Sequence, residues 1–200
     1  MLAVTSLAAI ALAPIPAQAI SFTLGNNTGS ISGQVSAFTG QSFTPNVGGN
    51  AADANFTTVL TSNPSQVYLN NFTFIGFTSS APTQLNIYAN SDRTGLVTSS
   101  TSNSGFSYTF NGLTPLNFGT QYYAFYPNDE NNVEGILEIP TQYSGGETYL
   151  GGFRTGGIGT NFTATLDPTP VPFDFEPTGA VVILGGLWGL KRWVKKKRQG

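Results

Sequence analysis

The sequence predicts an all-β protein, an antiparallel β-sandwich of the jelly-roll type followed by a short C-terminal transmembrane helix. Three observations lead to this fold class. Short stretches of alternating apolar and polar residues recur along the chain, with the period of a half-buried strand. Clusters of Gly, Pro, Asn, Asp and Ser separate them, as turns do. Aromatic residues are abundant, with 15 Phe and 8 Tyr, and no apolar period of about 3.6 residues occurs before Pro177, so we expect no helix there.

The clearest predicted strand covers residues 67–77. Within it Leu69 falls on one parity, whereas Phe72 and Phe74 fall on the other. A bulge at Asn70-Asn71 returns all three side chains to one face. The other predicted strands cover residues 31–38, 84–88, 106–110, 121–126, 135–139 and 161–166. Predicted turns separate them at residues 46–50, 79–82, 91–95, 111–112, 127–132 and 144–146.

Residues 1–19 have the features of an export signal. An apolar stretch at residues 7–13 precedes Ala17-Gln18-Ala19. Small residues such as Ala17 and Ala19 are what signal peptidase accepts, so we expect cleavage before Ile20. No Lys or Arg precedes the apolar stretch, which leaves two interpretations: the true start lies upstream, or targeting is weak. A buried first helix is the alternative, but Pro14 and Pro16 disfavour it. One β-sandwich ectodomain is expected over residues 20–166.

The C-terminal part has three blocks: a Pro-rich spacer at 167–177, an apolar run at 178–190 and a basic tail at 191–200. An apolar run followed by Lys and Arg halts a chain in a bilayer with its end in the cytoplasm. The run is short, since its helical rise of roughly 20 Å compares with a hydrocarbon core of about 30 Å. A buried helix of a soluble domain is the alternative, but it leaves the cations unexplained. The basic stop consists of Lys191, Arg192, Lys195, Lys196, Lys197 and Arg198.

These blocks resemble the PEP-CTERM class of bacterial sorting signals, and most closely the cyanobacterial variant with a Pro-Phe-Glu signature. Here Pro172-Phe173 is followed by Asp174 in place of Glu. The resemblance implies that an exosortase-like enzyme cuts near the motif and releases the ectodomain or transfers it to the surface. The sorting motif is Val171, Pro172, Phe173, Asp174, Phe175, Glu176 and Pro177.

The central part resembles the "choice-of-anchor" surface domains of bacteria. The similarity runs over about residues 50–166 and rests on the order of five stretches: 56–60, 67–74, 85–92, 106–116 and 119–125. It implies a β-fold and a surface location, but no activity.

Composition excludes several classes of function. Residues 20–176 hold ten acidic residues and two arginines, a net charge of −8, whereas the tail carries +6. An acidic ectodomain argues against nucleic-acid binding, which depends on clustered Lys and Arg. The absence of Cys excludes disulfides, and the absence of His and Cys excludes the Ser-His-Asp triad, Cys nucleophiles and the common zinc ligand sets. We predict no enzyme and no cofactor. The remaining catalytic alternative is a carboxylate-pair hydrolase, with candidates Asp129, Glu130, Glu134, Glu138 and Glu147.

Two binding functions stay open. Asp129, Asn131 and Glu134 offer oxygen ligands of the kind that Ca²⁺ takes, although Val133 interrupts the EF-hand spacing. A solvated turn is the alternative. Tyrosines could stack on sugar rings, the alternative being that most of them fill the core with their hydroxyls at its rim. The eight tyrosines are Tyr68, Tyr88, Tyr108, Tyr122, Tyr123, Tyr126, Tyr143 and Tyr149.

The sequence therefore predicts an exported protein of the cell envelope, surface or extracellular matrix, anchored in the membrane at least transiently. Its expected role is structural or adhesive. The alternative is a module that binds extracellular polysaccharide or Ca²⁺, and the third hypothesis is the carboxylate-pair hydrolase. Expected partners are signal peptidase, an exosortase-like enzyme and the membrane.

Overall fold

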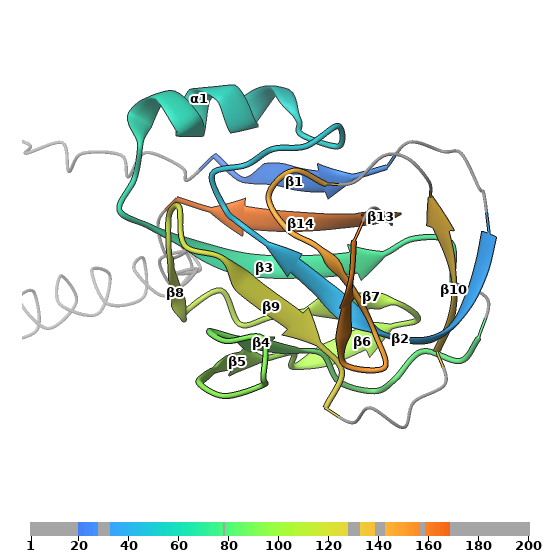
Figure 1. The fold of residues 1–200 in the computed structure, drawn as a ribbon. Helices are drawn as coiled ribbons and strands as arrows, with labels where there is room; N and C mark the ends of the chain where they lie inside the picture. The colour runs from blue at the N-terminus through green and yellow to red at the C-terminus, as the bar shows by residue number, and fades with distance from the viewer. Residues whose placement is uncertain are drawn as a thin grey trace, which may run out of the picture.

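The computed structural model describes residues 20–27, 33–77, 79–127, 133–138, 143–156 and 159–168. Of residues 33–36 and 133–138 it describes the backbone alone. The chain forms two antiparallel sheets and one α-helix in these residues (Figure 1). The predicted all-β class is therefore confirmed.

The first sheet has six strands, and β14 and β3 lie at its centre. Its order is β1 (Phe22–Asn26), β14 (Phe162–Asp167), β3 (Gln66–Phe74), β7 (Ser107–Thr109) and β6 (Ser102–Ser104), with β8 (Pro115–Asn117) also paired to β3.

The second sheet has eight strands, and β2 and β9 lie at its centre. Its order is β12 (Phe153–Thr155), β11 (Thr148–Leu150), β2 (Gly33–Phe43), β9 (Tyr122–Phe125), β4 (Asn86–Tyr88) and β5 (Leu96–Ser99). Two further strands extend it: β10 (Val133–Glu138) pairs with β2, and β13 (Gly159–Thr160) pairs with β10.

Aromatic rings from both sheets meet in one hydrophobic core. The Phe38 and Phe74 ring centroids are 5.0 Å apart, and those of Phe43 and Phe72 are 5.4 Å apart. Within the six-stranded sheet, Phe72 and Phe162 stack at 5.2 Å with an interplanar angle of 5°. Removing each such side chain from water contributes about 1.5–3 kcal/mol. This core holds the two sheets face to face.

The predicted bulge in β3 is confirmed. Leu69 pairs with Leu166 and Asn71 pairs with Thr165, so Asn70 has no partner in the β14 register. The extra residue moves Leu69 onto the same buried face as Phe72. The side-chain amide of Asn70 has a hydrogen-bond partner, because its Nδ2 donates to the Asp167 carboxylate at 2.6 Å.

The expectation that no helix precedes Pro177 is wrong, because residues Ala54–Ser62 form helix α1. Asp53 caps it, and its Oδ1 accepts from the amides of Asn55 and Phe56 at 3.0 Å each. Only Phe56 and Val59 are buried, and the Phe56 ring lies 6.0 Å from that of Phe22 in β1. Two apolar contacts in nine residues give too weak a period to be recognised in the sequence.

Several strand limits also differ from the prediction. The strand expected at 31–38 continues to Phe43, and the one expected at 67–77 ends at Phe74. Short strands without alternating apolar residues were not predicted. Ser102–Ser104, for example, is fully exposed and is a strand only because it pairs with β7. The other unpredicted strands are β1, β5, β8, β11, β12 and β13.

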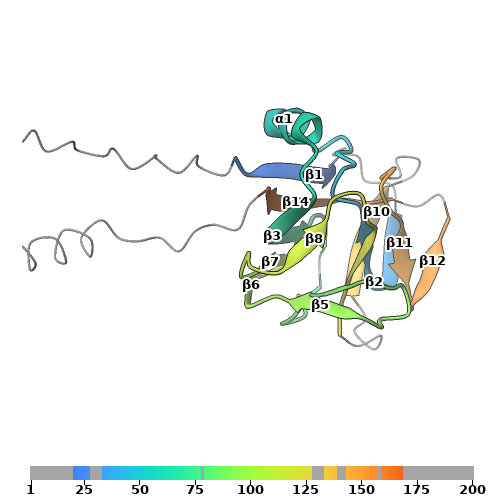
Figure 2. The ribbon, with the colours of Figure 1, turned by 90° about the vertical axis from the view of Figure 1, so that its left-hand side faces the viewer.

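The two ends of the described domain leave from one place. Phe22 in β1 pairs with Leu166 in β14, and Ser21 Oγ donates to the Asp167 carboxylate at 2.5 Å. Figure 2 shows β1 and the end of β14 on the side of the molecule opposite β11 and β12. Within the described residues, no helix has the length and apolar character needed to span a bilayer. The helix predicted at 178–190 lies outside them.

Candidate functional site

The outer face of the eight-stranded sheet carries a second group of aromatic residues, separate from the core. We call Tyr88, Tyr123, Phe125 and Tyr149 the outer aromatic cluster. It arises from alternation along β9, since Tyr122 and Ala124 point into the core whereas Tyr123 and Phe125 point outward. The chain thus has aromatic side chains on both faces of one strand.

The outer rings cover one another. Phe125 and Tyr149 centroids are 4.8 Å apart, and Tyr123 lies 6.0 Å from Tyr149. The Arg93 guanidinium lies 5.4 Å from the centre of the Phe125 ring, within cation–π range. As a result Phe125 is 2% exposed although it is on the outside of the sheet.

Gly40 in β2 makes room for this cluster. A Cβ at position 40 would stand 2.4 Å from Phe125 Cδ1 and 2.1 Å from the Ala124 carbonyl oxygen. Its φ of +153° also disfavours other residues. The Phe125 side chain therefore packs against a strand surface that only glycine provides.

A pocket opens beside the cluster, with a volume of about 470 Å³. Its residues come from the segment before β9, the segment before β11, and β12. Gly146 lies against β2, because a Cβ there would be 1.9 Å from the Ser42 carbonyl oxygen. The residues that line the pocket are Gln121, Tyr143, Ser144, Gly146, Glu147 and Arg154.

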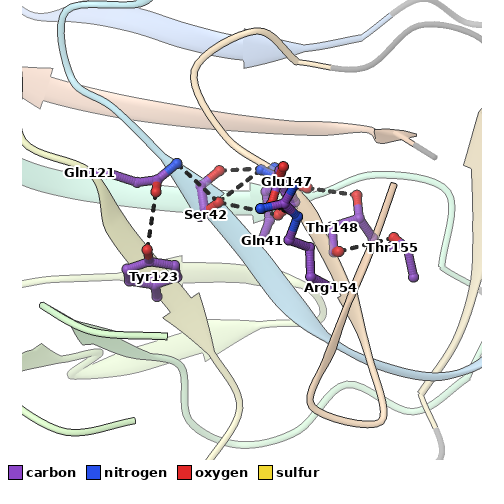
Figure 3. A network of polar contacts seen from close by, with 8 residues as sticks. All are labelled: Gln41, Ser42, Gln121, Tyr123, Glu147, Thr148, Arg154 and Thr155. Atoms are coloured by element: carbon purple, nitrogen blue, oxygen red, sulfur yellow. Dashed lines mark hydrogen bonds and ion pairs between the residues drawn. The ribbon is translucent and has the colours of Figure 1, made fainter. Parts of the chain in front are cut away.

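Hydrogen bonds join the Glu147 segment of the pocket to β2 (Figure 3). Ser42 N donates to the Glu147 carbonyl at 2.9 Å, and Glu147 N donates to Ser42 Oγ at 2.8 Å. Beneath them the buried Thr148 hydroxyl donates to Gln41 Oε1 at 2.8 Å and lies 2.9 Å from the Thr160 hydroxyl. The backbone of the Glu147 segment is therefore joined to the central strand at several points.

Polar side chains surround the opening. Arg154 Nε lies 2.6 Å from Glu147 Oε2, and the Tyr123 hydroxyl donates to Gln121 Oε1 at 3.0 Å. The Glu147 side chain is 23% exposed and that of Arg154 67%. The pair is thus open to solvent and contributes about 0–1 kcal/mol to stability, so its position at a pocket is of more interest than its strength.

Burial affects the tyrosines of the site. Desolvation raises the pKa of Tyr149, and the neighbouring Tyr123 and Glu147 raise it further. Desolvation also raises the pKa of Tyr143, whose hydroxyl lies within hydrogen-bonding distance of the Thr44 and Val47 carbonyls. Both hydroxyls therefore stay protonated at neutral pH and act as neutral hydrogen-bonding groups.

Of the predicted catalytic and metal-binding residues, the pocket contains Glu147, and of the predicted sugar-binding tyrosines it contains Tyr143. The Glu147 carboxylate is paired with Arg154. For Glu134 and Glu138 only the backbone in β10 is described. No group of three or more His, Cys, Asp or Glu side chains in the described ranges could hold a metal ion. The residues that lie outside the description are Ala17, Ala19, Asp129, Glu130, Asn131, the motif at 171–177 and the tail at 191–200.

Most tyrosines are unavailable for stacking on sugars, which corrects that expectation for the set as a whole. Six of the eight are buried, and Tyr68 and Tyr123 are half-buried. The alternative, in which tyrosines fill the core, is confirmed for Tyr108, Tyr122, Tyr126 and Tyr143. Their hydroxyls do reach polar partners in places: that of Tyr108 donates to the Pro82 carbonyl at 2.9 Å, as expected for core tyrosines.

Ser42, Gln121 and Arg154 were not predicted as site residues. They lie in three segments that only the sheet order brings together. The one local signal is the run Gln121–Phe125, where aromatic residues occupy both parities. An aromatic strand without alternation indicates that its outer face is also covered or used.

Comparison of the chain with family models, with curated proteins and with solved structures finds no match. The assignment of function therefore depends on the residues and their geometry.

Proposed function

We propose that this protein is an exported, non-catalytic surface module with a structural or adhesive role, built as a jelly-roll-like sandwich and displayed through its C-terminal segment. The observation that supports it best is the arrangement of the ends relative to the pocket. Strands β1 and β14 bring Ile20 and Pro168 to one side of the molecule. Strands β11 and β12, which flank the pocket, lie on the opposite side (Figure 2).

A tether that begins at Pro168 would hold the domain by this side. The outer face of the eight-stranded sheet would then point away from the membrane, where it can meet material outside the cell. The end of β14 suits a load-bearing attachment, because Asp167 accepts hydrogen bonds from both Ser21 and Asn70. These bonds join the last strand to both of its neighbours in the sheet.

The intact mass of the protein from its native host, measured separately in the cell fraction and the medium, tests this proposal. We expect a species without residues 1–19 and without everything beyond about Pro172. Such a mass requires both export and cleavage at the sorting motif. A membrane species that retains the tail through Gly200 would contradict sorting by an exosortase-like enzyme, and a cytoplasmic full-length species would contradict export.

The pocket favours a second candidate, the glycan-binding module. We do not extend the proposal to a hydrolase. Glycoside hydrolysis uses two facing carboxylates, and Glu147, the one candidate whose side chain is described, is paired with Arg154.

A further inference from the structure

We infer that the pocket bounded by Gln121, Glu147 and Arg154, with Tyr123 at its edge, is a binding site for one neutral sugar unit of an extracellular polysaccharide. This inference deepens the adhesive role proposed above, but it does not depend on how the chain is sorted. A protein that is exported and processed as expected and yet binds no saccharide would separate the two.

Polar groups at the rim of the pocket can form further hydrogen bonds. Arg154 uses Nε on Glu147, and its two terminal nitrogens take no partner among the described residues. Glu147 Oε1 likewise has no described partner, and Gln121 Nε2 has only a long contact of 3.5 Å to Ser42 Oγ. The rim therefore offers donors and acceptors side by side, and a sugar hydroxyl, which donates and accepts at once, matches both.

An aromatic surface, formed by Tyr123, lies next to these polar groups. Tyr123 is half-buried, and its hydroxyl is fixed by Gln121. Its ring makes an edge contact with Tyr149 at 6.0 Å and an interplanar angle of 79°. A held ring beside a polar rim suits a ligand that has one apolar C–H face and polar edges, as a pyranose does.

The pocket has no net charge, and the domain around it is acidic. Glu147 and Arg154 neutralise one another within the pocket, and residues 20–176 carry a net charge of −8. A polyanionic chain would be repelled by such a domain. Electrostatics therefore favour a neutral polysaccharide over one of uronic or sulfated sugars.

The pocket is held in place by the central strand, and its size suits a small ligand. The paired hydrogen bonds between Ser42 and Glu147 hold the carboxylate segment on β2, and Gly146 packs against the same strand without room for a side chain. A site formed before the ligand arrives loses little conformational entropy on binding. Its volume of about 470 Å³ lies in the range of small-ligand sites, roughly 300–1,000 Å³.

Affinity electrophoresis of the full-length chain tests the site, in native gels that contain dextran, galactan, mannan or xylan, and in parallel alginate or polygalacturonate. Because the full-length chain includes the predicted transmembrane helix, the gels contain a detergent, and that detergent must lack a sugar headgroup. The test variant combines Gln121→Ala with Glu147→Ala, which removes the amide and carboxylate acceptors but leaves the backbone hydrogen bonds between Ser42 and Glu147 possible. Gln84→Ala is the matched control, because Gln84 is exposed and lies outside the pocket. A second variant, Tyr123→Phe, removes the hydroxyl that fixes Gln121 and keeps the ring.

We expect at least one neutral polysaccharide to retard the protein with a dissociation constant on the order of 1 mM per sugar site. The double variant should weaken this retardation about ten-fold or more, and Gln84→Ala should leave it unchanged. All variants should melt within about 2 °C of the parent chain. Retardation by the anionic gels alone, by none of the gels, or equally for parent and double variant would overturn the inference. If the double variant fails to fold, loss of retardation in Tyr123→Phe supports the site, and its retention counts against it.

Discussion

The inner and the outer aromatic faces of the eight-stranded sheet carry the same residue types on the same strand, but their side chains make different contacts. Tyr122 faces inward from β9 and is covered by the opposing sheet, whereas its neighbour Tyr123 faces outward and is only half-buried. The inner rings contact rings of the other sheet, as Phe43 contacts Phe72. The outer rings contact one another, and Tyr123 connects them to the polar pocket through its hydrogen bond to Gln121.

Burial alone therefore does not identify a structural residue. Phe125 and Tyr149 are almost as buried as core residues, but their cover consists of side chains that belong to one sheet. The inner face determines whether the two sheets pack at all. The exposed polar side chains of the outer face, such as Glu147 and Arg154, can change at little cost to the fold. The outer face is therefore the surface on which we place a binding function.

The largest expected effect is in the core between the two sheets, at a ring of β3 that the inner face contacts. Phe72→Ala removes a ring that stacks on Phe162 and contacts Phe43 and Phe74. We expect the free energy of unfolding to fall by about 3–5 kcal/mol, the usual cost of a large cavity in a core. Urea unfolding monitored by circular dichroism measures it, with the half-exposed Leu113→Ala as control. A loss below about 1 kcal/mol would mean that the two sheets do not share this core.

The next largest effect is expected from alkaline pH, which tests the burial of a tyrosine in the core between the sheets. Burial raises the pKa of Tyr108 to about 12, against a value near 10 in the unfolded chain. Between these values the unfolded chain releases a proton that the folded chain keeps, so stability is full below about pH 10 and falls as pH rises toward 12. Urea unfolding at several pH values checks this, and Tyr108→Phe should flatten the dependence. The same slope in parent and variant would contradict the burial of this hydroxyl.

A glycine on the outer face should matter less, but measurably. Gly40→Ala forces a methyl group against the Ala124 carbonyl and the Phe125 ring at a φ that alanine disfavours. We expect a loss of about 1–3 kcal/mol, measured by urea unfolding. Gly105→Ala is the matched control, because position 105 also has a positive φ but nothing lies within 4 Å of its Cβ. Equal losses at the two positions would show that Phe125 does not pack on β2.

The smallest expected effect is at the pocket itself. Glu147→Gln removes one member of a solvent-exposed ion pair, so its cost in unfolding free energy should stay below about 1 kcal/mol. Thermal unfolding of parent and variant provides the measurement. A loss of several kcal/mol would make the pair a structural element and would weaken the case for a binding role.

Much of the fold could be predicted because it depends on local alternation. The slip of parity between Leu69 and Phe72 predicted a bulge, and the pairing of Leu69 with Leu166 places it at Asn70. Helix α1 was missed, since its cap at Asp53 and its contacts through Phe56 and Val59 depend on the neighbouring β1. A strand such as Ser102–Ser104 exists because of its partner and not because of its own residues.

Of the candidate site, the sequence predicted Glu147 as a carboxylate candidate and Tyr123 and Tyr143 among the candidate sugar-binding tyrosines. Ser42, Gln121 and Arg154 lie in segments far apart in the sequence, and they converge because β11 and β9 flank β2 in the sheet. No spacing rule relates them. The tyrosines illustrate the same limit: Tyr122 and Tyr123 are adjacent in sequence, and only the pleat of β9 decides which of them belongs to the core.

Carboxylate footprinting tests the central claim most directly, namely that the outer face of the eight-stranded sheet is the binding surface. The protein is labelled with a carbodiimide and an amine, with and without the neutral polysaccharide that retards it, and labelling is read by mass spectrometry. We predict that labelling of Glu147 falls when the polysaccharide is present. Labelling of Asp92, which is exposed and lies outside the pocket, should not change. Unchanged labelling of Glu147, or an equal fall at both residues, would contradict the account.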